Sequence, residues 1–309
     1  MTTAQPLTHE TVLLAEAVQG LAVRSEGIYL DATFGRGGHS AAILAKLGDS
    51  GLLFATDRDL RAKVAAEALT ASDARVQFKH VEFSKAPDWL ASLGLQGQVD
   101  GVLFDLGVSS PQIDEAARGF SFQQNGPLDM RMNQQAGQTA AQWLAIAEEV
   151  DIANVLYQLG DEKFSRRIAR RIVETRATQP LLTTFDLVRC IVEATPRQDP
   201  RKHPATRSFQ AIRLHINREL DEITQTLAQV VDLLAIGGRL VVISFHSLED
   251  RIVKNFMRDE STTDKDFFGQ PVGTARLKRV GGSVRASAAE IARNPRSRSA
   301  IMRIAERVA

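Results

Sequence analysis

The sequence predicts an α/β fold in which a parallel sheet is covered by helices on both faces and interrupted by a helical insertion. From residue 28 onward, short apolar runs rich in β-branched residues alternate with longer helical patterns, which is typical of such a sheet. The alternation stops at Gly107 and resumes only after about residue 216. A chain of 309 residues also has room for one large domain and an additional module.

Four βα units open the predicted sheet. Two helical segments, Ser40 to Leu47 and Leu60 to Leu69, are long enough for right-handed crossovers between parallel strands. The four predicted strands are Ile28 to Ala32, Leu52 to Thr56, Arg75 to Val81 and Val99 to Phe104.

The second half of the chain divides into an insertion and a return to the sheet. From about Ser110 to Ile216 the segments are helical, with no convincing strand among them. The sheet then resumes with a helix at Glu219 to Leu234, the turn Gly237-Gly238 and a strand at Arg239 to Phe245. After these we expect a helix that ends at Lys254 to Met257, a mobile loop at Ser261 to Thr274 and a last strand at residues 299 to 307. We therefore expect a core in two parts, residues 1–110 and 217–309, and an inserted helical domain at 111–216.

Composition excludes several classes of protein. A single cysteine, Cys190, rules out a disulfide framework within the chain and a multi-cysteine zinc cluster, and we predict no metal site. Residues 1–20 lack the pattern of a secretory signal, and no apolar stretch approaches the ~18 residues that would span a bilayer. The expectation is a soluble, cytoplasmic protein with no membrane partner.

Positive charge is concentrated in the insertion and at the C-terminus, although the net charge is only +1. Between Lys163 and Arg218 there are 13 Lys or Arg against 4 Asp or Glu, and between Arg276 and Ala309 there are 9 against 2. In the insertion, five cations fall on one helical stripe, opposite an apolar stripe: Lys163, Arg166, Arg167, Arg170 and Arg171. Such a stripe is either a solvated face or a phosphate-binding surface. The nearby cations Arg201, Lys202 and Arg207 favour a nucleic-acid surface.

A glycine-rich turn indicates a nucleotide-like cofactor. In IYLDATFGRGGHS, residues 28–40, a buried strand runs into a turn that opens a helix. The pattern Gly35-x-Gly37-Gly38 is not the dinucleotide fingerprint, because Ser40 stands where that motif requires Gly or Ala. The turn therefore suits a cofactor other than a dinucleotide, although a plain tight turn is the alternative.

Two carboxylates belong to the same predicted edge of the sheet. Asp57 follows the second strand, where a carboxylate accepts hydrogen bonds from the ribose hydroxyls of an adenosine. Asp residues at strand ends also cap helices. Asp59 is an alternative candidate for the ribose. Asp105 ends the fourth strand. No phosphate-binding P-loop, GxSxG elbow or HExxH motif is present. An adenosine site without a pyrophosphate cradle indicates S-adenosylmethionine.

Blocks spread over nearly the whole chain resemble the bacterial MraW or RsmH family. They include TVLLAEAV (11–18), DATFGRGGHS (31–40), LFDLGVSSPQ (103–112), GPLDMRM (126–132), HPATRSFQAIR (203–213), GGRLVVISFHSLEDRIVK (237–254) and NPRSRSA (294–300). The resemblance implies transfer of a methyl group from S-adenosylmethionine to N4 of a cytidine in 16S ribosomal RNA of the small subunit. It also implies a class I S-adenosylmethionine-dependent methyltransferase fold, with a Rossmann-like seven-stranded sheet and an inserted all-helical domain. The family's cofactor contacts fall on Gly37, Gly38, His39, Asp57, Phe83, Asp105 and Gln112.

The predicted chemistry depends on positioning, because N4 of cytosine is a poor nucleophile whereas the sulfonium methyl group is already activated. Asp105 would accept a hydrogen bond from N4 and stabilise the charge that develops there. The final proton acceptor is Asp105, His246 or water. The loop after Asp105 lacks the Pro-Pro-aromatic sequence common in DNA amino-methyltransferases, so Phe120, Phe122, Phe245 or His246 would have to stack on the base.

Structural roles stay open for His39 (helix cap or packing), Phe83 (core) and His246. Two other functions also stay open: a methyltransferase acting on protein, on another RNA or on a metabolite, and an assembly factor that binds RNA and cofactor without turnover. The sequence does not decide which nucleotide is the target, whether the substrate is free RNA or the assembled subunit, or whether the protein is a homodimer.

Overall fold

The computed structural model describes residues 10–196, 203–265 and 270–309, and the chain divides into two compact units. The core unit comprises the residues up to Gly107 and those from Leu220 onward; the inserted unit is Val108–Glu219. These limits lie within about three residues of the predicted domain boundaries.

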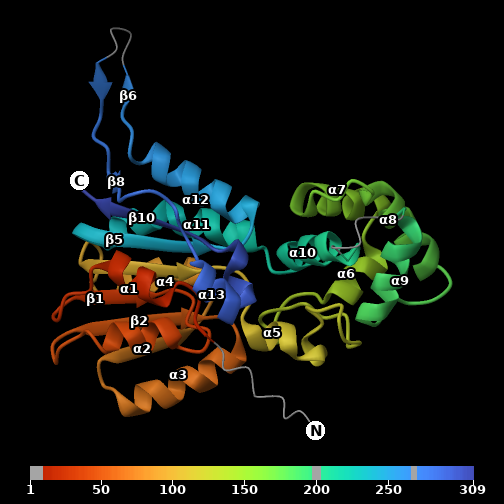
Figure 1. Cartoon of the computed structure of the whole chain (residues 1–309), viewed down its shortest axis with the longest axis horizontal. Helices are drawn as coiled ribbons and strands as arrows, with labels where there is room; N and C mark the ends of the chain where they lie inside the picture. The colour runs from red at the N-terminus through yellow and green to blue at the C-terminus, as the bar shows by residue number, and fades with distance from the viewer. Residues whose placement is uncertain (1–9, 197–202, 266–269) are drawn as a thin grey trace. The chain divides into compact units, whose positions relative to one another are not determined.

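A mixed sheet forms the centre of the core unit, in the order β3-β2-β1-β4-β5-β10-β8 (Figure 1). Five neighbouring strands are parallel, and β10 (Ile301–Arg307) runs antiparallel to β5. The five parallel strands are β1 (Ile28–Asp31), β2 (Leu52–Asp57), β3 (Val76–His80), β4 (Val99–Asp105) and β5 (Leu234–Ser244). All six of these strands were predicted.

The sheet has eight strands, not the seven that were predicted. Two short strands, β8 (Leu277–Arg279) and β9 (Val284–Arg285), both pair with β10. β8 and β9 therefore share the place of the seventh, outermost strand. Gly281 and Gly282 lie between them and separate the two strands.

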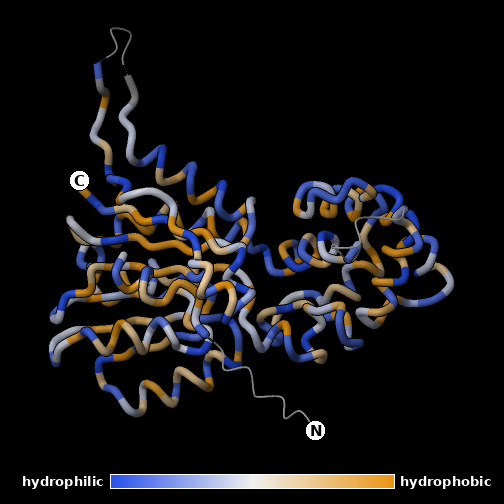
Figure 2. Tube along the Cα trace, viewed as in Figure 1, coloured by the Kyte–Doolittle hydropathy of each residue, from blue (hydrophilic) through white to orange (hydrophobic). Residues whose placement is uncertain are grey.

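Helices cover both faces of the sheet, as predicted. One apolar cluster joins β4 and β5 to α4 (Ala86–Ser92), α11 (Glu219–Leu233) and α12 (Ser247–Asp259). A second joins the opposite face to α1 (Leu14–Leu21) and α2 (Gly38–Leu44), while α3 (Leu60–Ser72) packs beside it against Phe34 and Phe78. Figure 2 shows the hydrophobic colour concentrated in the strands, whereas the helices alternate hydrophobic and hydrophilic residues.

β5 starts earlier than predicted. Leu234 already pairs with Val99, and the next paired residues are Arg239 and Gly101, so β5 bulges between them. Gly237, at φ 83°, allows this bulge. The Gly237-Gly238 pair is thus a bulge inside a strand and not a turn before one.

The predicted loop at Ser261 to Thr274 is only partly a loop. Its described residues include two short strands, β6 (Asp264–Lys265) and β7 (Pro271–Val272), which form a separate antiparallel pair. Figure 1 shows this hairpin extending beyond the sheet of the core unit. Residues 266–269, which belong to the same prediction, lie outside the described residues.

The inserted unit is helical where the structure describes it, and its one β contact there is an isolated bridge between Pro127 and Thr183. Its helices pack around a separate apolar core that includes Leu144, Leu156, Ile168 and Ile212. They are α5 (Ser110–Asp114), α6 (Ala140–Ile146), α7 (Glu149–Gly160), α8 (Ser165–Arg176), α9 (Thr184–Ala194) and α10 (Ala205–Ile216), with the short 3₁₀ turn η2 (Ala116–Arg118). Nowhere in the described part of the chain is a helix long and apolar enough to cross a membrane.

Candidate active site

Three carboxylates end three adjacent strands of the core unit. Asp31 is the last residue of β1, Asp57 of β2 and Asp105 of β4. Because β2, β1 and β4 are neighbours and parallel, the three side chains lie at one edge of the sheet. Asp57 and Asp105 were predicted there. Asp31 was missed, although the same strand-end argument applies to it.

The glycine turn between β1 and α2 is shaped by the chain around it. Gly35 and Gly37 have φ of 56° and 77°, in the left-handed region that favours glycine. A Cβ atom on Gly37 would lie 2.7 Å from the Phe34 ring, and one on Gly38 would collide with the Thr11 hydroxyl. Packing inside the chain therefore already requires glycine at both positions, whether or not a cofactor approaches them.

Asp57 holds this turn in place. Its Oδ2 accepts a hydrogen bond from the Gly35 N–H (2.7 Å), and its Oδ1 accepts one from the Asp59 N–H (2.8 Å). Burial raises the pKa of Asp57, and the two hydrogen bonds oppose that rise. Asp59, the alternative ribose ligand, is buried and caps α3 by accepting from the Arg61 N–H. Because Asp59 is buried and Asp57 only half-buried, Asp57 is the stronger candidate.

Asp31 is a buried carboxylate beneath the turn. It accepts hydrogen bonds from the Ser40 hydroxyl (2.6 Å) and the Thr33 N–H (3.2 Å). Burial nevertheless raises its pKa from 3.8 to about 6, and the charge of Asp57 contributes in the same direction. The site thus stores unfavourable electrostatic energy when all its carboxyls are ionised.

Asp105 is the group with an open acceptor. Its Oδ1 is buried and has no hydrogen-bond partner among the residues that the structure describes, while its Oδ2 lies 3.7 Å from Nδ1 of the buried His39. Burial, with the charges of Asp31 and Glu249, raises the pKa of Asp105 well above its ordinary value. A buried acceptor without a partner costs free energy, so this oxygen is available to a donor brought by a ligand.

The raised pKa of Asp31 predicts a specific dependence of stability on pH. A carboxyl whose pKa is higher in the folded than in the unfolded state stabilises the fold below its unfolded pKa, and this contribution is lost as pH rises through its folded pKa. For Asp31 the window runs from 3.8 to about 6, and the share lost is about 3 kcal/mol.

Asp31→Asn removes this titration, so its free energy of unfolding should improve relative to wild type as pH rises from 4 to 8. Urea denaturation of both proteins across that range measures the difference. A difference that does not change with pH would contradict the assignment.

His246 is held by Glu249. Glu249 is fully buried, and its Oε2 accepts from the N–H groups of Phe245 (2.8 Å) and His246 (3.3 Å). Its Oε1 lies 3.0 Å from Nε2 of His246, whose Nδ1 accepts from the Glu249 N–H at 3.5 Å. Both ring nitrogens thus face Glu249, and the imidazole caps α12. This arrangement supports the structural alternative for His246, and its role as proton acceptor stays a prediction. The three-residue spacing typical of a capping box was the signal that could have identified Glu249.

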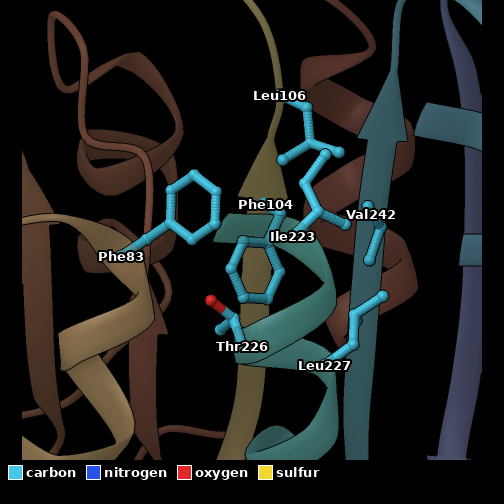
Figure 3. Close-up of a pocket in the computed structure, with 7 residues that line it drawn as sticks. All are labelled: Phe83, Phe104, Leu106, Ile223, Thr226, Leu227 and Val242. Atoms are coloured by element: carbon cyan, nitrogen blue, oxygen red, sulfur yellow. The ribbon is translucent and has the colours of Figure 1, made fainter. Parts of the chain in front are cut away.

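Phe83 lines a small apolar pocket near the same edge (Figure 3). Its ring meets that of Phe104 edge to face, with centroids 5.6 Å apart, and Figure 3 shows both rings in the pocket wall with Leu106 and Ile223. The cavity volume of about 10 Å³ has room for about one water molecule, so the pocket does not enclose any part of a cofactor.

Gln112 and two of the predicted stacking residues belong to the inserted unit. Gln112 is buried in α5, where its side-chain oxygen accepts from the Ser109 N–H as part of a capping box. Phe122 stacks on His203 and packs against Phe209, and Phe120 lies beneath the Arg118 guanidinium. Cofactor contact by Gln112 and base stacking by Phe120, Phe122 or Phe245 stay predictions.

The predicted basic stripe lies on α8, which begins just after Lys163. Ile168 and Ile172 are buried in the core of the inserted unit, and Arg166, Arg167 and Arg170 are exposed, as the pattern predicted. The five cations differ in pairing. Arg171 binds Glu193 and approaches Glu174, and Arg170 lies 3.9 Å from Glu149. Lys163, Arg166 and Arg167 form no ion pair with any residue that the structure describes.

The second basic segment is described in part. Arg207 is exposed on α10, and its guanidinium donates to the Asp161 carbonyl. Arg201 and Lys202 lie outside the described residues. Within the described ranges, no three His, Cys, Asp or Glu side chains are grouped so that they could hold a metal ion.

Comparison with known proteins identifies the family. The MraW methylase family matches residues 6–308. A relative from Thioalkalivibrio sulfidiphilus, the ribosomal RNA small subunit methyltransferase H, is 54% identical over 306 residues, which cover 97% of this chain and 98% of the relative. The crystal structure of an rRNA methylase from Streptococcus thermophilus is 10% identical with a TM-score of 0.44, and the match covers 98% of this chain and all of that one. The match and the relative confirm the resemblance and the methyltransferase fold that it implied: the chain belongs to the MraW methylase family.

Proposed function

We propose that this protein transfers a methyl group from S-adenosylmethionine to the exocyclic N4 of a cytidine in 16S ribosomal RNA, in the cytoplasm where small subunits are assembled. The observation that carries the proposal is the buried Oδ1 of Asp105 at the edge of the sheet, which has no hydrogen-bond partner within the described ranges. Such an oxygen can accept a hydrogen bond from the N–H of an exocyclic amino group. Membership of a methylase family supplies the reaction class.

The residues at the edge of the sheet fit S-adenosylmethionine, which supplies an electrophilic methyl group when bound. Asp57 retains lone pairs beyond the two that accept from the Gly35 and Asp59 amides, and these can receive ribose hydroxyls. Phe83 and Leu106 offer an apolar wall for the adenine. The concentration of carboxylates around Asp31, Asp57 and Asp105 favours a cationic sulfonium.

Asp105 has two tasks in this proposal. As an ionised acceptor it holds an N4 hydrogen, which orients the nitrogen lone pair, and it stabilises the positive charge that develops on that nitrogen. It can afterwards hold the proton, because burial keeps its pKa high. Nδ1 of His39 lies 3.7 Å from Oδ2 of Asp105, on the side away from the open Oδ1. The target base must be unstacked to reach this edge.

The inserted unit is proposed to hold the RNA backbone. Lys163 and Arg166 are exposed, and the charge of neither is compensated by a described carboxylate. Lys163→Glu with Arg166→Glu should make the salt dependence of RNA binding shallower, by roughly 1.4 to 1.8 in the slope of log K against log salt. Affinity for cofactor should not change.

Binding of 16S RNA at several salt concentrations measures this slope. Lys46→Glu with Lys278→Glu is the matched control, since both lysines are exposed on the core unit and the charge change is the same. If the α8 variant and the control had equal slopes, the α8 stripe would be a solvated face.

Labelled S-adenosylmethionine with small ribosomal subunits as acceptor tests the function. Label recovered in 16S RNA supports the proposal. Label in ribosomal protein would identify a protein methyltransferase, and tight binding of both ligands without transfer would identify an assembly factor.

A further inference from the structure

The outward face of α12 carries a row of polar and basic side chains. The helix buries Glu249, Val253 and Met257 on its inner side. At 100° per residue, the opposite side consists of Ser247, Arg251, Lys254 and Arg258, all of them exposed. We call these four residues the α12 stripe.

Two of the three cations in this stripe have no carboxylate partner among the described residues. Arg251 and Lys254 form no ion pair with any part of the chain that the structure describes, and Arg258 pairs only with its neighbour Asp259. The first turns of α12 contain two acidic residues, Glu249 and Asp250. Asp250 accepts from the guanidinium of Arg303 in β10, at 2.7 and 2.9 Å, and forms no ion pair with Arg251 or Lys254.

Elsewhere in the core unit, arginines are commonly neutralised by carboxylates. Examples are the pairs Arg75–Asp73, Arg239–Glu306 and Arg276–Asp232. Unlike these arginines, Arg251 has no carboxylate partner in the described part of the chain.

The stripe starts at the candidate active site. α12 follows directly on the carboxyl end of β5, which is paired with β4 next to Asp105. Its first turn is fixed by the buried Glu249, which binds the N–H groups of Phe245 and His246. With a rise of 1.5 Å per residue, Arg251 and Lys254 lie about 6 and about 10 Å along the axis from Ser247. The cations thus succeed one another away from the edge where a target base would be held.

We propose that the α12 stripe binds phosphates of the RNA strand that flanks the target cytidine. This inference rests on the proposed function, and it adds an RNA contact on the core unit that is independent of the inserted unit. Arg251 and Lys254 would act through charge and would read no base, as backbone contacts do. They would also offset the repulsion between RNA phosphates and the carboxylates of the site.

The test uses a double variant in which both free cations of the stripe are replaced, Arg251→Gln together with Lys254→Gln. The matched control is a second double variant, Lys46→Gln together with Lys278→Gln. The control lysines are exposed and lie toward the opposite edge of the sheet. Lys46 follows the C-terminal end of α2. Lys278 pairs with Glu306 of β10, which in turn pairs with Arg239 of β5, far from the carboxyl end of β5. Affinity for protein-free 16S RNA and for assembled small subunits is measured from low to moderate salt. Melting temperature and cofactor affinity are measured for each variant.

The expected result is a slope of log K against log salt that is shallower by about 1.4 in the α12 variant than in the control, on free RNA and on subunits alike. The KM for RNA should rise, with cofactor affinity unchanged. A slope equal to that of the control would overturn the proposal. Weaker binding to subunits alone would overturn it too, and would identify a ribosomal protein as the partner. Methyl transfer by the wild type decides separately whether the proposed function holds.

Discussion

Asp105→Asn should lower the rate of methyl transfer by about 100-fold or more without loss of stability. The amide keeps the shape of the side chain but lacks the charge that holds the amino hydrogen and stabilises the developing positive charge. Stability should be maintained or improved, because the substitution removes repulsion from Asp31 and Glu249. Single-turnover rates at saturating S-adenosylmethionine separate chemistry from cofactor binding.

The pH profile gives a second readout. Burial raises the pKa of Asp105, so the ionised acceptor forms as pH rises, and the wild-type rate should increase with pH while the Asn variant stays flat. Asp100→Asn is the control on the same strand: Asp100 accepts from the Ile28 N–H at the other end of β4, and its loss should affect stability rather than the rate. An unchanged single-turnover rate in Asp105→Asn would refute the catalytic role.

Asp57→Ala should weaken cofactor binding by ~1.5 to 3 kcal/mol, or roughly 10- to 150-fold. It removes a charged acceptor for the ribose hydroxyls. It also releases the Gly35 N–H, so part of the loss reflects a less ordered turn. Isothermal calorimetry measures the affinity.

Asp59→Ala separates the two effects. Asp59 caps α3 beside the same turn through the Arg61 N–H, so its loss should cost stability of about 1 kcal/mol and leave the affinity nearly unchanged. Equal affinities of wild type and Asp57→Ala would show that the ribose is bound elsewhere.

Strand prediction failed for the short, polar strands at one outer edge of the sheet. The runs that became β1, β2, β4 and β5 are apolar because helices cover both faces. β8 and β9, by contrast, occupy the outer edge of the sheet, with Lys278, Arg279 and Arg285 exposed. Such short, polar edge strands carry no hydrophobic pattern, so only their pairing with β10 defines them.

The site was predictable to the extent that strand ends determine it. Asp57 and Asp105 follow from the rule that parallel strands direct their carboxyl ends to one edge. The open acceptor on Asp105 could not be predicted, because it depends on which neighbours supply donors after packing. The α8 stripe shows the same limit: Arg171 is neutralised by Glu193, which lies 22 residues away on another helix, so helical periodicity overstated the number of free cations.

The most direct test is the chemical identity of the methylated nucleoside. 16S RNA is incubated with the protein and labelled S-adenosylmethionine, both free and in assembled small subunits, then digested to nucleosides and resolved by mass spectrometry. We predict a single labelled product, N4-methylcytidine, absent with Asp105→Asn on the timescale of the wild-type reaction. Label on a ring carbon of cytosine, on a ribose hydroxyl or on another base would contradict it, because Asp105 would then have no amino group to hold.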